Sequence, residues 1–213
     1  MKNIFLHGLG QNSRSWDFIK EQLPDLKADC PDLFHGEVSY ETLFEKMEHR
    51  FLDVKEPLRI CGLSLGTILA LDYAIRHGKQ VESLILIGAQ YQMPTALIDL
   101  QNMIFRCLPS KFFSNSGLSK DSMLCLTKSM RTLDFSRNLS KIHCPVTVVC
   151  GQKDYANLKA AHALSERLPQ AKLYIIPGVG HEVNQLAPDA LVNIIREQWI
   201  PGGTSNSFKT VRM

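Results

Sequence analysis

The sequence predicts an α/β fold, a three-layer α/β/α sandwich around a mostly or fully parallel sheet of about six strands, with a helical insertion. Two patterns support this prediction. Short runs of aliphatic and β-branched residues alternate with longer stretches whose apolar residues recur at helical spacing. The short runs are continuously apolar, which is typical of parallel strands covered by helices on both faces. The 213 residues suit one domain, or one domain with an insertion.

Six short runs are the expected strands. Most of them are bounded by glycine or proline, which interrupt regular strand pairing. The second run is more polar than the others and ends at Pro31, so it is the least strand-like of the six. The expected strands lie at residues 2–6, 26–30, 58–62, 81–88, 146–150 and 173–176.

Helical patterns separate these runs. Residues 40–51 carry apolar side chains at i, i+3, i+4, i+7 and i+11, which predicts an amphipathic helix. The helix after Ser64 is apolar most of the way round, so we expect it to be buried. The last helix opens with Pro188, a residue suited to the first helical position. Further helices are expected at residues 13–23 and 157–168.

One long segment breaks the alternation of strands and helices. Residues 92–141 show no strand pattern but have leucines and isoleucines at helical spacing, which predicts a helical lid inserted between two strands. The segment has seven Lys or Arg and three Asp, a net charge of +4 that exceeds the +3 of the whole chain. Such an excess is usually a solvated face, and the alternative is a surface that holds an anionic substrate.

The remaining residues divide into a core and a tail. We expect residues 1–91 and 142–200 to form the α/β core. Residues 201–213 are rich in Gly, Ser and Thr and are expected to be a flexible tail.

Composition excludes several classes of protein. No basic run exceeds two residues, which argues against a nucleic-acid-binding protein. No apolar run approaches 18 residues, so no membrane span is expected. The six cysteines include no C-x-x-C pair, which excludes zinc-ribbon spacing. The apolar start is too short for a signal peptide, so a reduced, cytoplasmic setting is the expectation. The oligomeric state is left open.

The chain is organised around the stretch Gly62-Leu63-Ser64-Leu65-Gly66, which joins an expected strand to an expected helix. The pattern G-x-S-x-G at such a junction predicts a sharp turn in which glycines avoid steric clashes and the serine hydroxyl projects. The first amides of the helix then point toward whatever the hydroxyl attacks. A glycine-rich turn with a solvated serine is the alternative.

Two later loops offer the partners that a serine nucleophile needs, a base and a group that orients the base. Asp154 follows the expected strand at 146–150, and His181 follows the expected strand at 173–176. Because the carboxyl ends of parallel strands share one edge of a sheet, Ser64, Asp154 and His181 are expected to converge there.

With these motifs the chain resembles the α/β-hydrolase family along nearly its whole length. The order Ser…Asp…His is that of the family. Four motifs match it: His7-Gly8-Leu9-Gly10, the G-x-S-x-G stretch, Gly151-Gln152-Lys153-Asp154 and Gly180-His181. The insertion at 92–141 also falls where the family carries its lid. The chain starts at the strand before His7, so the family's usual first two strands are missing and a compact version is expected.

The resemblance implies roles for individual residues. Ser64 would be the nucleophile, His181 the base and Asp154 the acid, and the backbone amides of Leu9 and Leu65 would form the oxyanion hole. It implies no metal and no organic cofactor.

Three other residues have expected roles near this triad. Trp16 follows the first loop and is a candidate substrate contact, with core packing as the alternative. His7 is expected to hold the loop that presents Leu9, and Glu182 is a candidate to tune His181.

Several functions fit these motifs. The first is a serine hydrolase that cleaves a carboxylic ester through an acyl-enzyme, with a small molecule as substrate. The second keeps the fold and the triad but acts on an anionic substrate as a lyase, a thioesterase or a carbon–carbon bond hydrolase. The third is a ligand-binding, receptor-like module that retains the triad.

Overall fold

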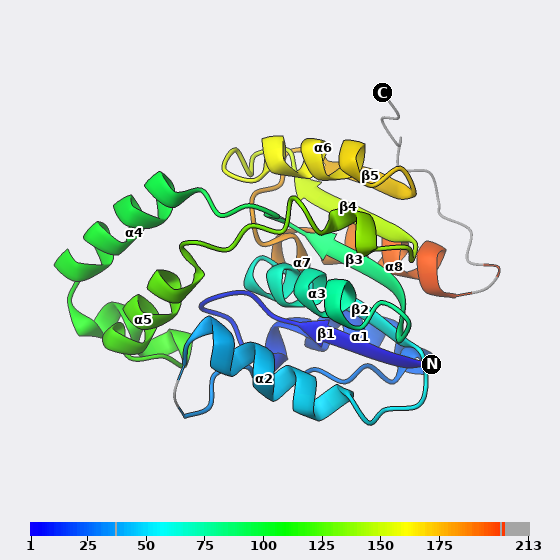
Figure 1. The fold of residues 1–213 in the computed structure, drawn as a ribbon, viewed down its shortest axis with the longest axis horizontal. Helices are drawn as coiled ribbons and strands as arrows, with labels where there is room; N and C mark the ends of the chain where they lie inside the picture. Colours follow the sequence, from blue (N-terminus) through cyan, green and yellow to red (C-terminus); the bar gives the residue numbers. More distant parts are fainter. Residues whose placement is uncertain (37, 201, 203–213) are drawn as a thin grey trace.

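The computed structural model describes residues 1–36, 38–200 and 202. Its centre is a parallel sheet whose strand order, β1-β2-β3-β4-β5, follows the chain (Figure 1). The prediction of a fully parallel sheet is confirmed. The strands are β1 (Lys2–Leu6), β2 (Leu58–Leu63), β3 (Val81–Ile87), β4 (Val146–Gly151) and β5 (Ala171–Ile176). The predicted flexible tail, residues 201–213, lies outside the described residues apart from Gly202.

The predicted count of six strands is wrong, because residues 26–30 do not form a strand. Asp29 makes a single bridge beside β1, with its N–H bonded to the carbonyl oxygen of Asn3 at 2.8 Å and its own carbonyl accepting from Phe5 at 2.9 Å. Pairing cannot extend further in either direction. Lys27 is in a left-handed conformation (φ 45°), and Pro31 has no N–H to donate.

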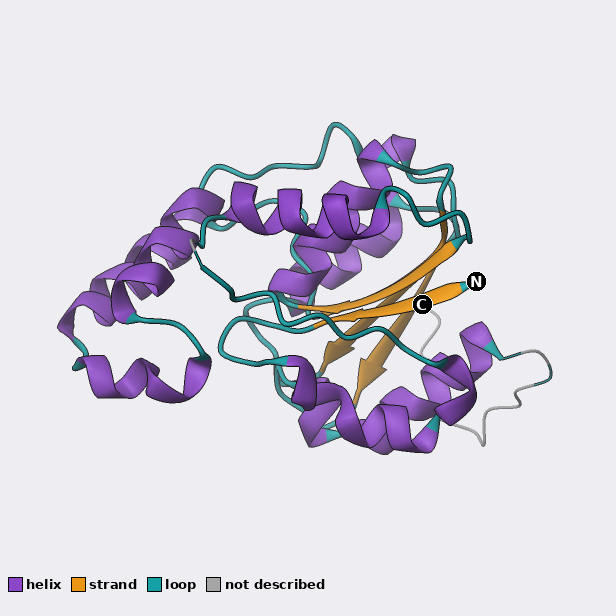
Figure 2. Cartoon of the chain, turned by 90° about the horizontal axis from the view of Figure 1, so that it is seen from below, coloured by secondary structure: helices purple, strands orange, loops and turns teal. Residues whose placement is uncertain are grey.

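Helices cover both faces of the sheet, so the three-layer prediction is confirmed (Figure 2). One face packs against α2, α3 and α6, and the other packs against α1 and α8. Strand side chains alternate between the two layers: Ile4 and Leu6 join the first, and Phe5 joins the second. The helices are α1 (Asp17–Gln22), α2 (Tyr40–Phe51), α3 (Leu65–Arg76), α6 (Leu158–Arg167), α7 (Val183–Leu186) and α8 (Pro188–Trp199).

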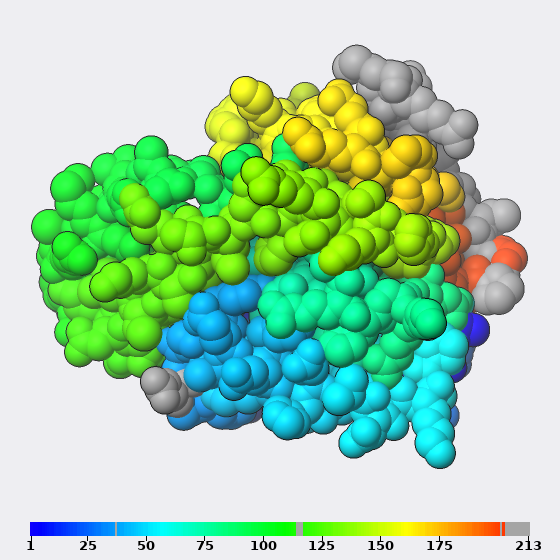
Figure 3. Space-filling model, viewed as in Figure 1, coloured from blue at the N-terminus to red at the C-terminus, as the bar shows by residue number. Residues whose placement is uncertain are grey.

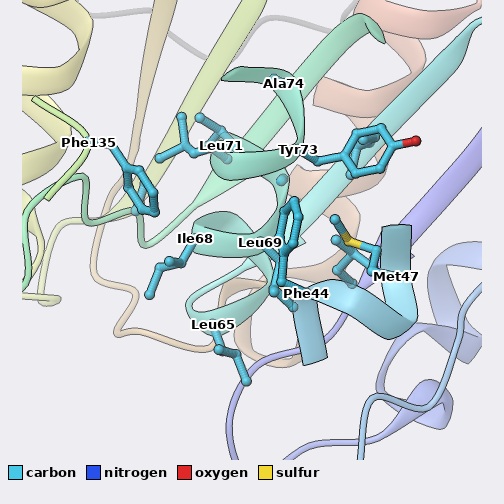
Figure 4. Close-up of a cluster of buried hydrophobic side chains, with 14 of the residues drawn as sticks. Phe44, Met47, Leu65, Ile68, Leu69, Leu71, Tyr73, Ala74 and Phe135 are labelled. Carbon is cyan, nitrogen blue, oxygen red and sulfur yellow. The ribbon is translucent and has the colours of Figure 1, made fainter. Parts of the chain in front are cut away.

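The most buried helix is α3, which starts directly after Ser64. Ten of its 12 residues are buried, as its apolar composition predicts. Phe44 and Met47 of α2 pack with Leu69 of α3 in the same apolar cluster (Figure 4). The helix that supports Ser64 is therefore fixed by packing on nearly every side.

Residues 92–141, called the insert segment below, lie between β3 and β4, and residues 95–130 of this segment form a lobe beside the sheet (Figures 1 and 3). Two helices, α4 and α5, pack against each other, and Arg131 pairs with Asp99 between them at 2.7 Å. The predicted helical character is therefore observed. The elements are α4 (Thr95–Cys107), η3 (Ser110–Ser116), α5 (Lys120–Met130) and η4 (Leu139–Lys141).

The outer face of α4 is apolar, which the sequence pattern alone did not predict. Leu100, Met103 and Ile104 are each more than two-fifths exposed, whereas Ile98 on the opposite face is buried. The helix therefore has apolar side chains on both faces. In the part of the chain that the structure describes, no helix combines the length and the apolar character that crossing a membrane requires.

Candidate active site

Ser64 occupies a sharp corner between β2 and α3. Its backbone is in an unusual conformation, φ 52° and ψ −111°, which a residue other than glycine adopts only under constraint. The flanking glycines make the corner possible. A Cβ atom on Gly66 would lie 2.3 Å from the carbonyl oxygen of Leu6, and one on Gly62 would lie 2.4 Å from the backbone of Gly66. This region of the chain tolerates only glycine at both positions.

Hydrogen bonds hold the backbone of Ser64 in this conformation. Its N–H donates to the carbonyl oxygen of Ile87 at 2.9 Å, and its carbonyl oxygen accepts from the N–H and the hydroxyl of Thr67, at 2.9 and 2.6 Å. Leu65 is the first residue of α3, so its N–H has no acceptor within the helix. The corner therefore presents a side chain and an amide in fixed positions.

The loops after β4 and β5 bring Asp154 and His181 together. Asp154 Oδ2 lies 2.7 Å from His181 Nδ1. The loops themselves are in direct contact, since Lys153 N–H donates to the carbonyl oxygen of Val179 at 2.8 Å. A Cβ atom on Gly151 would lie 2.1 Å from the carbonyl oxygen of Gly180. Close approach of the two backbones thus sets the distance between the carboxylate and the imidazole.

Asn157 is a site residue that the sequence reasoning missed. Its Nδ2 donates to both carboxylate oxygens of Asp154, at 2.8 and 3.0 Å, and lies 3.1 Å from His181 Nδ1. Because Nδ1 of His181 donates its hydrogen to Asp154, it cannot also accept one from Asn157. The hydrogen bonds of Asn157 Nδ2 are therefore those to the carboxylate. Gln90 in turn donates to Asn157 Oδ1 at 2.9 Å. The only feature of the sequence that could have indicated this role is the position of Asn157, an amide side chain three residues after Asp154.

The environment of Asp154 favours its charged form. Burial raises the pKa of this carboxyl group, but hydrogen bonds from His181 and Asn157 outweigh burial and hold the pKa below its ordinary value. Asp154 is only 5% exposed, so these two donors, with a longer contact of 4.0 Å from Cys150 Sγ, replace the hydrogen bonds that water would otherwise provide.

A cavity of about 660 Å³ connects these groups. Ser64, Asp154 and His181 all line it, together with Leu9 and Leu65, so the structure brings five predicted site residues to one space. The insert segment supplies about half of the lining residues that the structure describes. Gly88, after β3, also lines the cavity, and a Cβ atom on it would lie 2.8 Å from His181 Cε1.

The structure does not bring Trp16 to this cavity. The indole is fully buried on the opposite side of the sheet, where it packs against Phe5 with ring centroids 5.2 Å apart. The predicted substrate contact is therefore replaced by core packing. Trp16 precedes the short helix α1, which packs against α8. The burial of the indole is therefore decided by contacts with distant residues, which a local sequence pattern does not show.

His7 and Glu182 occupy supporting positions. His7 is fully buried; its Nε2 accepts from the N–H of Leu33 at 3.0 Å, and its Nδ1 lies 2.9 Å from the carbonyl oxygen of Gly8. Burial lowers its pKa, so the ring is held neutral within its own loop. Glu182 accepts from Gln11 at 3.1 Å, which ties the loop of His181 to the loop after β1. Across the described residues, no group of three or more His, Cys, Asp or Glu could hold a metal ion.

A match over most of the chain identifies the family. Residues 4–194 match the model described as the alpha/beta hydrolase family, and the protein belongs to that family. The resemblance inferred from the sequence is confirmed.

Individual relatives are more distant. A protein of Bacillus subtilis (strain 168), provisionally named 2-succinyl-6-hydroxy-2,4-cyclohexadiene-1-carboxylate synthase, is 24% identical, over 91% of this chain and 88% of the relative. A pimeloyl-[acyl-carrier protein] methyl ester esterase of Aromatoleum aromaticum is 34% identical, over 40% of this chain and 36% of the relative. The solved structure of MenH from S. aureus has a TM-score of 0.79 at 18% identity, over 92% of each chain, and this likeness is one of fold. These names and the family match support an enzyme of the hydrolase type.

Proposed function

We propose that the protein is a serine hydrolase that cleaves a carboxylic ester through an acyl-enzyme on Ser64. One observation carries the proposal: the 2.7 Å contact between His181 and Asp154 lies on the same cavity as a serine held in a strained corner. A strained corner with a projecting hydroxyl and a nearby imidazole–carboxylate pair is the arrangement that activates a serine nucleophile.

The proposed reaction begins with attack of Ser64 Oγ on the ester carbonyl carbon. His181 accepts the hydroxyl proton on Nε2, because Nδ1 is bonded to Asp154. The backbone amides of Leu65 and Leu9, both at the cavity, would stabilise the oxyanion, a contribution of about 3–4 kcal/mol for each donor. His181 then protonates the leaving alkoxide, and water activated by the same ring releases the acid and restores Ser64.

A second candidate function uses the same residues on an anionic substrate, as a lyase, a thioesterase or a carbon–carbon bond hydrolase. The name of the Bacillus subtilis relative, which is that of a synthase of a cyclohexadiene carboxylate, favours it. The name of the Aromatoleum aromaticum relative, an ester esterase, favours the first candidate. The basic excess of the insert segment would suit an anionic substrate, but no Lys or Arg is among the described residues that line the cavity.

A fluorophosphonate probe tests the proposed nucleophile. We expect covalent labelling of the native protein, loss of labelling and of 4-nitrophenyl ester turnover in Ser64→Ala, and retention of both in Ser165→Ala. Ser165 is a matched control, because its hydroxyl binds the carbonyl oxygen of His162 on α6. Folded protein that neither reacts with the probe nor turns over any ester would contradict the proposal, and saturable ligand binding under those conditions would favour a receptor-like module.

A panel of substrates separates the two enzymatic candidates. Neutral esters and carboxylated or thioester substrates of similar size are compared by kcat/KM at low and high salt. Preference for neutral esters without a salt effect supports the first candidate. Preference for anionic substrates that salt abolishes supports the second, because screening weakens attraction between a basic surface and an anion.

A further inference from the structure

The wall that the insert segment contributes to the cavity is apolar. Ten of its twelve described lining residues are apolar, among them Ile98, Phe105 and Met123. Phe105 and Phe113 pack edge to face with ring centroids 5.4 Å apart, so two aromatic rings form part of this wall. A substrate that fills the cavity therefore buries mostly hydrocarbon against it.

Charge in the cavity disfavours an anion. No Lys or Arg occurs among the described lining residues, and the buried carboxylate of Asp154 does. An anionic group there would lose hydration without gaining a cationic partner, and it would be repelled by Asp154. The cavity therefore fits a neutral molecule.

The cations of the insert segment are located elsewhere. Arg131 is paired with Asp99, and Lys120 Nζ donates to the carbonyl oxygens of Arg106 and Leu108, at 2.6 and 2.8 Å. Arg106 and Lys128 line a separate hollow between α4 and α5 that shares no lining residue with the catalytic cavity. The basic excess in the sequence is therefore not a property of the cavity.

Polar side chains in the cavity are few, and most of them are engaged. The Thr127 hydroxyl donates to the carbonyl oxygen of Met123 at 2.9 Å. Gln90 and Asn157 are bonded to each other in the network around Asp154. Besides the Ser64 hydroxyl, the exception is Gln101: it lies on α4 at the cavity, and its side-chain amide makes no hydrogen bond within the described residues.

We propose that Ser64 acts on a neutral ester with an apolar body and one uncharged hydrogen-bonding group, which Gln101 binds. A hydroxyl, a carbonyl or an amide would pair with the Gln101 side chain, which can both donate and accept. This inference rests on the proposed function and names the substrate class of the same site. Gln101 acts here as a specificity-determining residue, placed on the wall that the insert segment contributes to the cavity.

Three matched esters test the substrate class. They share one leaving group and one chain length, and their acyl chains end in a methyl, a hydroxyl or a carboxylate group; a second series varies the alcohol part in the same way. In at least one series, we expect the wild-type kcat/KM for the hydroxyl ester to exceed that for the methyl ester by on the order of tenfold, with the carboxylate ester lowest.

Substitutions at position 101 test the assignment of the residue. Gln101→Leu is expected to remove the preference for the hydroxyl ester over the methyl ester, whereas Gln92→Leu keeps the wild-type preference. Gln101→Lys supplies the missing cation and is expected to raise kcat/KM for the carboxylate ester. Gln92→Leu is the matched control on the same segment, because Gln92 is bonded to Asp134 at 3.1 Å and does not line the cavity.

The possible results are distinct. A wild-type preference for the carboxylate ester overturns the neutral-substrate inference, and an unchanged hydroxyl preference in Gln101→Leu overturns the role of Gln101. In both cases fluorophosphonate labelling of Ser64 and turnover of the methyl ester still support the proposed function. Loss of labelling and of all ester turnover in the folded wild-type protein overturns the proposed function itself.

Discussion

The carboxylate of Asp154 is held by two side chains from different elements. His181 comes from the loop after β5, and Asn157 lies at the start of α6. Each donor contributes to keeping the pKa of Asp154 below its ordinary value. A carboxylate fixed by two donors also fixes the imidazole ring that binds to it, so Asn157 acts through Asp154 as a positioning residue.

Replacement of Asn157 by Ala should therefore affect catalysis more than folding at neutral pH. We expect kcat to fall on the order of tenfold, the equivalent of one hydrogen bond to a charged group. The pKa of Asp154 should rise, so loss of stability on acidification should move to higher pH, because a carboxylate with a lowered pKa contributes stability that disappears as pH falls through that pKa.

Steady-state kinetics and urea unfolding across pH check both effects. Asn157→Ser, which restores a small donor, should recover part of kcat. Asn193→Ala on α8 is the control for removal of an amide. Unchanged kcat and an unchanged acid limb in Asn157→Ala would rule out the positioning role.

A second prediction at the residue scale concerns Gly88, whose backbone lies against the ring of His181. A methyl group there would come within 2.9 Å of His181 Nδ1, so Gly88→Ala should displace the ring and reduce ester turnover by more than tenfold. Gly36→Ala is the matched control, because Gly36 also has a positive φ, 70°, but its methyl group would meet open space. Equal loss of activity in the two variants would assign the effect to backbone strain instead.

At the scale of the elements, the edge of the sheet at β1 is closed by a segment that is not a strand. Asp29 bridges to β1 through its backbone, and its carboxylate pairs with Lys2 and Arg50, at 3.2 and 2.9 Å. The same residue thus links β1, the connection after α1 and the end of α2. Partial burial raises the pKa of Asp29, but the hydrogen bonds from Arg50 and Lys2 outweigh it and the pKa is lowered.

Replacement of Asp29 by Asn should lower stability in a pH-dependent way. Because the folded-state pKa is depressed, the stabilisation is present above the unfolded-state pKa and disappears as pH falls through the folded-state value. We expect a loss of about 1 kcal/mol at neutral pH, typical of a partly exposed ion pair, that shrinks toward pH 3. Urea titrations at both pH values measure it. Asp25→Asn, at an exposed carboxyl in the same connection, should show a smaller effect, and a pH-independent loss would contradict this account.

Sequence patterns predicted the strongly apolar elements and the residues at strand ends. The strands β1 to β5, the buried α3 and the convergence of Ser64, Asp154 and His181 on one cavity all depend on local hydrophobic runs and on parallel topology. Two features were not predicted, the bonds of Asn157 to Asp154 and the exposed apolar face of α4. The burial of Trp16 behind the sheet was only the alternative to a substrate contact, because contacts between distant residues decide it.

At the scale of the molecule, burial is unevenly distributed. In α3 ten of 12 residues are buried, whereas in α4 only Ile98 is buried among 13 residues. Elements with few buried contacts open at lower free energy than the core. The corner at Ser64 therefore belongs to the most stable part of the structure, and the wall that carries Gln101 belongs to a less stable part.

Hydrogen–deuterium exchange tests this distribution. Amides of α4, Thr95–Cys107, are expected to exchange faster than those of α3, Leu65–Arg76, under native conditions. A covalent fluorophosphonate with an apolar chain should slow exchange in α4 while α3 is unaffected. Equal protection of the two helices in the free protein would show that the insert segment opens only with the core.

The insert segment also separates the candidate site residues into two groups along the chain. Ser64 and Leu9 precede it, whereas Asp154 and His181 follow it, and the two halves meet along the paired strands β3 and β4. Two polypeptides made by dividing the gene within residues 92–141 would each carry an incomplete site. Their joint expression, with each half fused to one of two interacting proteins, would turn the proposed ester cleavage into a reporter of association between those proteins.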